Sequence, residues 1–82
     1  MKKYVITVLN SKIPVLVDTE AEFCARSFAG AARQFKRKYH LRGEFIAETQ
    51  GVFSPKYVIG NFWTKCKFGG LSNTGTRIFI NQ

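Results

Sequence analysis

Apolar side chains recur with the period of an α-helix between residues 27 and 43. They fall at positions i, i+3, i+4, i+7 and i+11, which are Phe28, Ala31, Ala32, Phe35 and Tyr39. This spacing predicts one amphipathic helix whose apolar side packs against the rest of the chain. Ser27 is a suitable N-cap, because its hydroxyl can accept hydrogen bonds from the free amides of the first turn. Gly43 suits the left-handed position that follows a last turn.

Before the helix, the pattern changes to that of β-strands. β-branched residues predict a strand over residues 3–9, followed by a polar turn at 10–12. A second strand is expected over residues 13–18, where Pro14 favours an edge position or the strand entry.

Residues 19–26 allow two interpretations. The four residues from Thr19 to Glu22 match a capping box, so a long helix can begin at Glu20. Alternatively, residues 22–26 form a short third strand, with Phe23 alternating with its polar neighbours. We favour the strand, because Ser27 already supplies a cleaner start for the helix.

Strand patterns also follow the helix, at residues 44–49, 56–68 and 77–80. A turn-bearing link at 50–55 and a flexible glycine-rich loop at 69–75 are expected to connect them. The elements predict a single α+β domain over residues 1–82. One helix packs on a curled, largely antiparallel five- to six-stranded sheet in the order ββ(β)αβββ.

Charge adds a functional expectation. The chain carries 13 Lys and Arg against 5 Asp and Glu, a net charge of +8. This excess favours a polyanionic partner, although solubility is the simpler explanation. Opposite its apolar side, the predicted helix carries Arg33, Lys36, Arg37 and His40, and this basic stripe extends into Lys38 and Arg42. These residues either follow a phosphate backbone or form an ordinary solvated face. We expect the first reading, with phosphate contacts from Arg33, Lys36, Arg37 and Arg42.

The long strand at 56–68 offers a second candidate surface. One of its faces has a core composition: Val58, Gly60, Phe62, Thr64, Cys66 and Phe68. The other face mixes aromatic and basic side chains, a composition suited to stacking on bases while neutralising phosphates. We expect Tyr57, Trp63, Lys65 and Lys67 to form this platform. The alternative is that Tyr57, Ile59 and Trp63 cover a second small core.

Other chemistry is not expected. Cys24 and Cys66 with a single histidine cannot complete a four-ligand zinc site, and we expect both to be buried free thiols. No nucleophile, base and orienting group can be located, so the chain is not expected to be an enzyme or to need a cofactor. No segment has the length of a signal-peptide core or a membrane span, so a cytoplasmic location without a membrane partner is expected, in a host cell if the protein is viral.

Residues 23–33 place a short strand before a helix with paired alanines, and residues 46–51 follow as a strand ending in a charged residue and glycine. This arrangement resembles the monomeric archaeal chromosomal protein family and its viral relatives, over residues 20–65. The resemblance implies binding and bending of double-stranded DNA with little sequence preference. The layout is also similar to small phage anti-CRISPR proteins, a resemblance of size and architecture.

Two functions therefore emerge from the sequence. The first is a small basic nucleic-acid-binding protein that uses electrostatic and stacking contacts with little sequence specificity. The alternative is an inhibitor encoded by a phage or mobile element, which docks on a host nucleoprotein complex by protein–protein contact. DNA and RNA, duplex and single-stranded, are all open as ligands.

Overall fold

The computed structural model describes residues 1–48 and 56–82 of the chain. In this part, the regular elements follow the order ββαβββ, with a short 3-10 helix in the first connection. Their bounds are β1 (Lys2–Asn10), η1 (Pro14–Leu16), β2 (Glu20–Ala25), α1 (Phe28–Lys38), β3 (Glu44–Ala47), β4 (Tyr57–Lys65) and β5 (Leu71–Asn81). The expected link at residues 50–55 and the last residue of the expected strand 44–49 lie outside the described residues.

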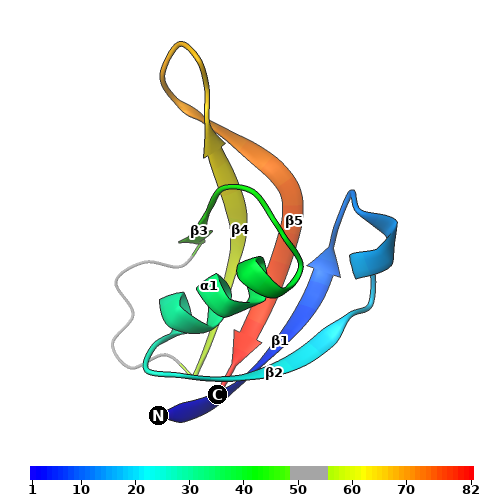
Figure 1. The fold of residues 1–82 in the computed structure, drawn as a ribbon, viewed down its shortest axis with the longest axis vertical. Helices are drawn as coiled ribbons and strands as arrows, with labels where there is room; N and C mark the ends of the chain where they lie inside the picture. Colours follow the sequence, from blue (N-terminus) through cyan, green and yellow to red (C-terminus); the bar gives the residue numbers. More distant parts are fainter. Residues whose placement is uncertain (49–55) are drawn as a thin grey trace.

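The strands form one antiparallel sheet in the order β2-β1-β5-β4-β3, so the predicted α+β architecture is confirmed. β5 lies at the centre of the sheet, and β2 and β3 are its two edges. α1 connects these edges and therefore crosses one face of the sheet (Figure 1). The face on the other side carries no helix among the described residues. We call it the open face.

The core lies between α1 and the sheet. Ala31, Ala32 and Phe35 of α1 are buried, as the helical period predicted. Small alanines let the helix approach the sheet closely, and the Phe35 ring then reaches the Phe62 ring of β4, with 6.3 Å between their centroids. The sheet contributes alternate residues to the same core: Tyr4, Ile6, Val8, Ala25, Phe62, Ile78 and Ile80.

α1 starts where the sequence predicts and ends earlier. The Ser27 hydroxyl accepts a hydrogen bond from the Gly30 amide at 3.0 Å, so the predicted N-cap is confirmed. The helix ends at Lys38, and His40 takes the left-handed conformation with φ 54°. The Leu41 amide then donates to the Lys36 carbonyl at 2.9 Å, as in a Schellman motif. The prediction that Gly43 terminates the helix is therefore wrong.

The strand predicted over residues 13–18 is wrong. Pro14 opens the 3-10 helix η1, and the backbone turns again at Asp18, which has φ 62°. Only Leu16 reaches the core, while Ile13 and Val15 remain exposed. The alternation of these apolar residues imitated a strand. The second strand is instead β2, which includes the segment 22–25 that the alternating pattern favoured.

In the C-terminal half, the strands β4 and β5 pair over more residues than predicted. The expected flexible loop at 69–75 is wrong, because residues 71–75 belong to β5, and the expected strand 77–80 is only its end. The reverse turn is confined to residues 66–70, where Gly69 and Gly70 have positive φ. β4 ends at Lys65, so Cys66 and Phe68 lie beyond the strand rather than on its core face.

Candidate nucleic-acid interface

A shallow cationic groove runs along the exposed side of α1. Its first depression, of about 450 Å³, lies beside the N-terminal half of the helix and is lined by Arg26, Arg33 and Arg37, among others. The second depression, of about 300 Å³, shares Arg33 and Arg37 and adds Lys36 and His40. Because they share two arginines, these depressions form one continuous surface.

A third depression extends this surface onto the sheet. It has a volume of about 260 Å³ and is lined by His40 and Arg42 together with Thr74 and Thr76 of β5. The left-handed turn at His40 makes this possible, because it ends the helix and directs the chain across β5 towards β3. The α1 groove comprises Arg26, Arg33, Lys36, Arg37, His40 and Arg42.

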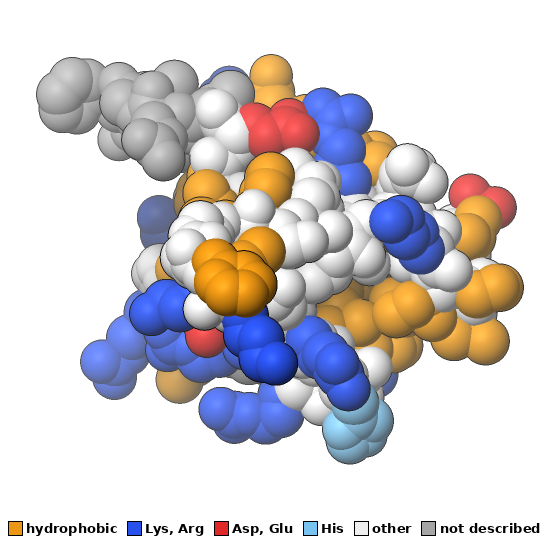
Figure 2. Space-filling view, turned by 90° about the horizontal axis from the view of Figure 1, so that it is seen from above, with side chains coloured by type: hydrophobic (Ala, Val, Ile, Leu, Met, Phe, Trp, Pro, Cys, Tyr) orange, Lys and Arg blue, Asp and Glu red, His pale blue; other side chains and the backbone are white. Residues whose placement is uncertain are grey.

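Carboxylates are scarce along the α1 groove. No Asp or Glu occurs between residues 26 and 43. In the described part of the chain, the only carboxylate that pairs with a groove residue is that of Glu44, which accepts a hydrogen bond from Lys36 Nζ at 3.2 Å. Figure 2 shows Lys and Arg side chains gathered on one side of the molecule, with little acidic surface among them. The groove therefore has a positive electrostatic potential. The Glu44 carboxylate offsets part of it, at Lys36.

Lys38 lies outside the groove. Its ammonium group is 5.8 Å from the centroid of the Phe23 ring and 5.4 Å from that of the Tyr39 ring. These cation–π contacts place it over the aromatic side chains that cover the core near β2. Lys38 is therefore engaged with aromatic rings on another side of the helix, and the groove contains the other helix cations, of which Lys36 pairs with Glu44.

The predicted aromatic platform lies on a different surface. Tyr57 and Trp63 are on the open face of the sheet, whereas the α1 groove is on the helix side. They are also separated by six residues of extended strand, about 20 Å. Tyr57 stacks on Phe79 of the neighbouring strand, with 5.2 Å between centroids. Trp63 lines a small apolar depression with Ile46 and other residues of the open face. The two rings do not form one platform.

Lys65 is the last residue of β4, two residues beyond Trp63, and Lys67 lies in the turn at the tip of the β4–β5 hairpin; both lysines are exposed. The structure thus brings together Arg33, Lys36, Arg37 and Arg42 of the predicted site residues. It places the other four elsewhere. Arg26 was missed by sequence reasoning, although its position directly before the N-cap Ser27 was a signal that it lies beside the first turn.

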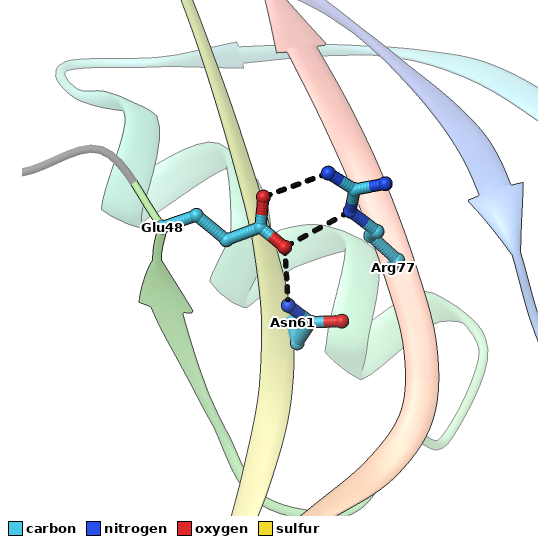
Figure 3. A network of polar contacts seen from close by, with 3 residues as sticks. All are labelled: Glu48, Asn61 and Arg77. Atoms are coloured by element: carbon cyan, nitrogen blue, oxygen red, sulfur yellow. Dashed lines mark hydrogen bonds and ion pairs between the residues drawn. The ribbon is translucent and has the colours of Figure 1, made fainter.

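On the open face, Glu48, Asn61 and Arg77 form a polar network (Figure 3). Glu48 accepts hydrogen bonds from the Arg77 guanidinium and from the Asn61 amide. These bonds, the Arg77 contact foremost, hold the pKa of Glu48 below its ordinary value. Because Arg77 is satisfied by this carboxylate, it is not a free cation for a ligand.

The two cysteines are the remaining candidate groups from the sequence. Cys24 and Cys66 are free thiols, and both are exposed, so the expectation that they are buried is wrong. Within residues 1–48 and 56–82, no group of three or more His, Cys, Asp and Glu side chains is placed to hold a metal ion. None of the helices in the described ranges is long and apolar enough to cross a membrane.

Comparisons with known proteins add no relative. No protein-family model matches the chain, and no match was found to a curated protein or to a solved structure.

Proposed function

We propose that this protein binds nucleic acid through the α1 groove, by contacts to phosphates that do not depend on sequence. The observation that supports this most directly is the continuity of the groove, in which Arg33 and Arg37 line two adjoining depressions and no carboxylate in the described chain pairs with either.

The chemistry of these side chains fits phosphate. A guanidinium presents a planar set of N–H donors that matches two phosphate oxygens, and it stays charged at all physiological pH values. Arg33 and Arg37 are one helical turn apart, about 6 Å along the axis. His40 and Arg42 continue the groove beyond the helix end. A backbone laid along the groove would meet donors in succession.

The shape of the groove favours contact with the backbone over the reading of bases. Its depressions are shallow and carry cations along their whole length, whereas the one amide side chain in the lining, that of Gln34, already donates to the Cys24 carbonyl at 2.7 Å. Phosphate contacts fix position and affinity without carrying sequence information. We therefore infer a binder with little sequence preference.

The decisive experiment compares two double variants that lose the same charge. Arg33→Gln with Arg37→Gln removes the groove cations, and Lys3→Gln with Lys56→Gln removes two exposed cations elsewhere. Binding to a fluorescein-labelled random duplex and to a single strand is followed by anisotropy at several salt concentrations. Each lost phosphate contact flattens the slope of log K against log salt by about 0.9 on duplex DNA, so the groove variant should lose close to two units.

The control variant separates local contact from overall charge. If both double variants weaken binding equally, the groove is a solvated face and the charge acts only through the overall field of the protein. If the parent protein binds neither probe at low salt, the nucleic-acid proposal fails. In that case, the inhibitor that docks on a host nucleoprotein complex becomes the function to test.

A further inference from the structure

The tip of the β4–β5 hairpin exposes an aromatic ring that takes no part in the packing of the core. Phe68 is 99% exposed, and Leu71 beside it is 52% exposed. The turn that carries Phe68 is closed by backbone hydrogen bonds, from the Cys66 amide to the Gly70 carbonyl at 3.1 Å and from the Gly69 amide to the Cys66 carbonyl at 3.2 Å. The ring is thus held at the end of an ordered turn.

The hairpin carries its tip away from the core. β4 and β5 shift register between Asn61 and Trp63, where β5 contains extra residues around Gly75, which has φ 90°. Such a bulge bends a strand and increases its local twist. Beyond it, the hairpin extends past the helix to the far end of the molecule (Figure 1).

The charge around Phe68 has one sign. Lys65 and Lys67 precede it in the sequence by three residues and by one, and no Asp or Glu follows Glu48 anywhere in the chain. An exposed ring that closely follows two lysines suits a nucleotide, because the ring can stack on a base while the cations meet the adjoining phosphates.

The tip is also connected to the α1 groove. The third depression joins His40 and Arg42 to Thr74 and Thr76, which lie in the part of β5 that leads to the tip. A nucleic-acid strand bound along the α1 groove would therefore continue towards Phe68. This connection is the reason to assign the tip to the same ligand as the groove.

We propose that Phe68 stacks on an unpaired base, with Lys65 and Lys67 on the flanking phosphates, so that the protein prefers nucleic acid with exposed bases over intact duplex. This rests on the proposed function of the α1 groove. An unpaired base offers its face to the ring without cost, whereas a ring that enters a duplex must first separate stacked base pairs.

The test measures the binding of three variants to a fluorescein-labelled oligothymidylate and to a blunt duplex of the same length. Phe68→Ala should lower affinity for the single strand about tenfold, with the salt slope unchanged, because stacking is not an ionic contact. Its effect on the blunt duplex should stay within about twofold, since an intact stack offers no free base face. Phe68→Tyr should keep the single-strand affinity. Val15→Ala, which trims another strongly exposed apolar side chain, is the control and should change neither.

The outcomes separate the two proposals. If the parent protein binds both probes and Phe68→Ala binds them equally well, the stacking proposal fails and the groove proposal stands. If the parent binds neither probe, both fail. Sedimentation with phosphatidylcholine vesicles, with and without phosphatidylserine, provides a further arm. Binding to the anionic vesicles that depends on Phe68, without any effect on oligothymidylate, would assign the tip to a lipid surface and overturn the proposal.

Discussion

Glu48 and Arg77 form a two-pronged ion pair that reaches across a strand. Arg77 Nε lies 2.9 Å from Glu48 Oε1, and Arg77 Nη2 lies 2.8 Å from Glu48 Oε2. Arg77 is in the central strand β5, Glu48 follows the edge strand β3, and Asn61 of the intervening β4 donates to the same carboxylate at 3.1 Å. The network therefore ties the end of an edge strand to the centre of the sheet.

This network predicts a dependence of stability on pH. The pKa of Glu48 is lowered in the folded protein, chiefly by Arg77, so the unfolded chain takes up a proton at higher pH than the folded one. The stabilisation is complete above the ordinary glutamate range, near pH 4.3, and is lost as the pH falls through the lowered value. Glu48→Gln should therefore lower the melting temperature at pH 7 and have little effect in strong acid.

Glu22→Gln is the matched control for Glu48. Glu22 is exposed on the edge strand β2, and no salt bridge in the described ranges involves it. Melting curves followed by circular dichroism at both pH values decide the question. A gap between the parent and Glu48→Gln that stays constant into strong acid would show that the variant acts through packing rather than through the ion pair.

The sequence predicted α1 well because its information is local. The apolar period of Phe35 and its neighbours and the hydroxyl of Ser27 act within a few residues, and both were confirmed. The prediction of a flexible loop at 69–75 failed because the pairing of this segment depends on distant contacts. Residues 71–75 are rich in loop-forming types, yet residues 71–73 pair with β4 because the hairpin extends beyond the bulge at Gly75. Pairing over a register shift leaves no signal in either segment alone.

The candidate site could be predicted only in part, for a related reason. The period of α1 put Arg33 and Arg37 on one exposed face, and the structure agrees. The relation of that face to β4 depends on which side of the sheet the helix crosses, which a strand's alternation does not specify. The sequence therefore did not show that Tyr57 and Trp63 lie on the side of the sheet opposite the α1 groove. Phe68 was assigned to the core because nothing in the alternation marks the end of β4 at Lys65.

Any substitution of Gly43 should destabilise the protein. Its φ is 87°, and a Cβ built there would lie 2.4 Å from the Trp63 carbonyl oxygen, a contact that backbone atoms cannot relieve by rotation. Gly43→Ala combines a left-handed strain of about 1 kcal/mol or more with this clash, and should displace β3 from β4. Urea unfolding should show a large loss of stability.

Gly30→Ala provides the control for this variant. Gly30 lies in α1, and a Cβ there would be in ordinary contact, 3.4 Å from the Ser27 hydroxyl oxygen and 3.5 Å from Ala25 Cβ. Alanine has a higher helix propensity than glycine by about 1 kcal/mol, so this variant should be as stable as the parent or more stable. Equal losses in both variants would mean that the chain at Gly43 does not lie as close to β4 as the structure places it.

Phe35 is the central contact between the helix and the sheet. It is fully buried, and its ring meets those of Phe23, Tyr39 and Phe62. Phe35→Ala should reduce the free energy of unfolding by about 3–5 kcal/mol, a large share of the stability of so small a domain. Phe68→Ala deletes the same side chain at an exposed position and should leave the denaturation midpoint unchanged. Equal midpoints for the parent and Phe35→Ala would contradict the orientation of α1.

The pair formed by Lys36 and Glu44 makes a prediction about binding. In the described ranges, Glu44 is the acid that pairs with a residue of the α1 groove. Its side chain is 81% exposed, so the pair contributes at most about 1 kcal/mol to folding. Near a phosphate backbone its effect is larger, because the carboxylate occupies Lys36 and repels the ligand. Glu44→Gln should therefore raise affinity for nucleic acid severalfold and steepen the salt slope by up to about 0.9 on duplex DNA, as one cation becomes available.

Lys36→Gln should have less effect than Arg33→Gln in the parent, and more effect when Glu44 is already replaced. Glu22→Gln makes the same change in net charge on the edge strand β2, away from the groove. If it raises affinity as much as Glu44→Gln does, the gain comes from net charge alone and Lys36 is not a ligand contact.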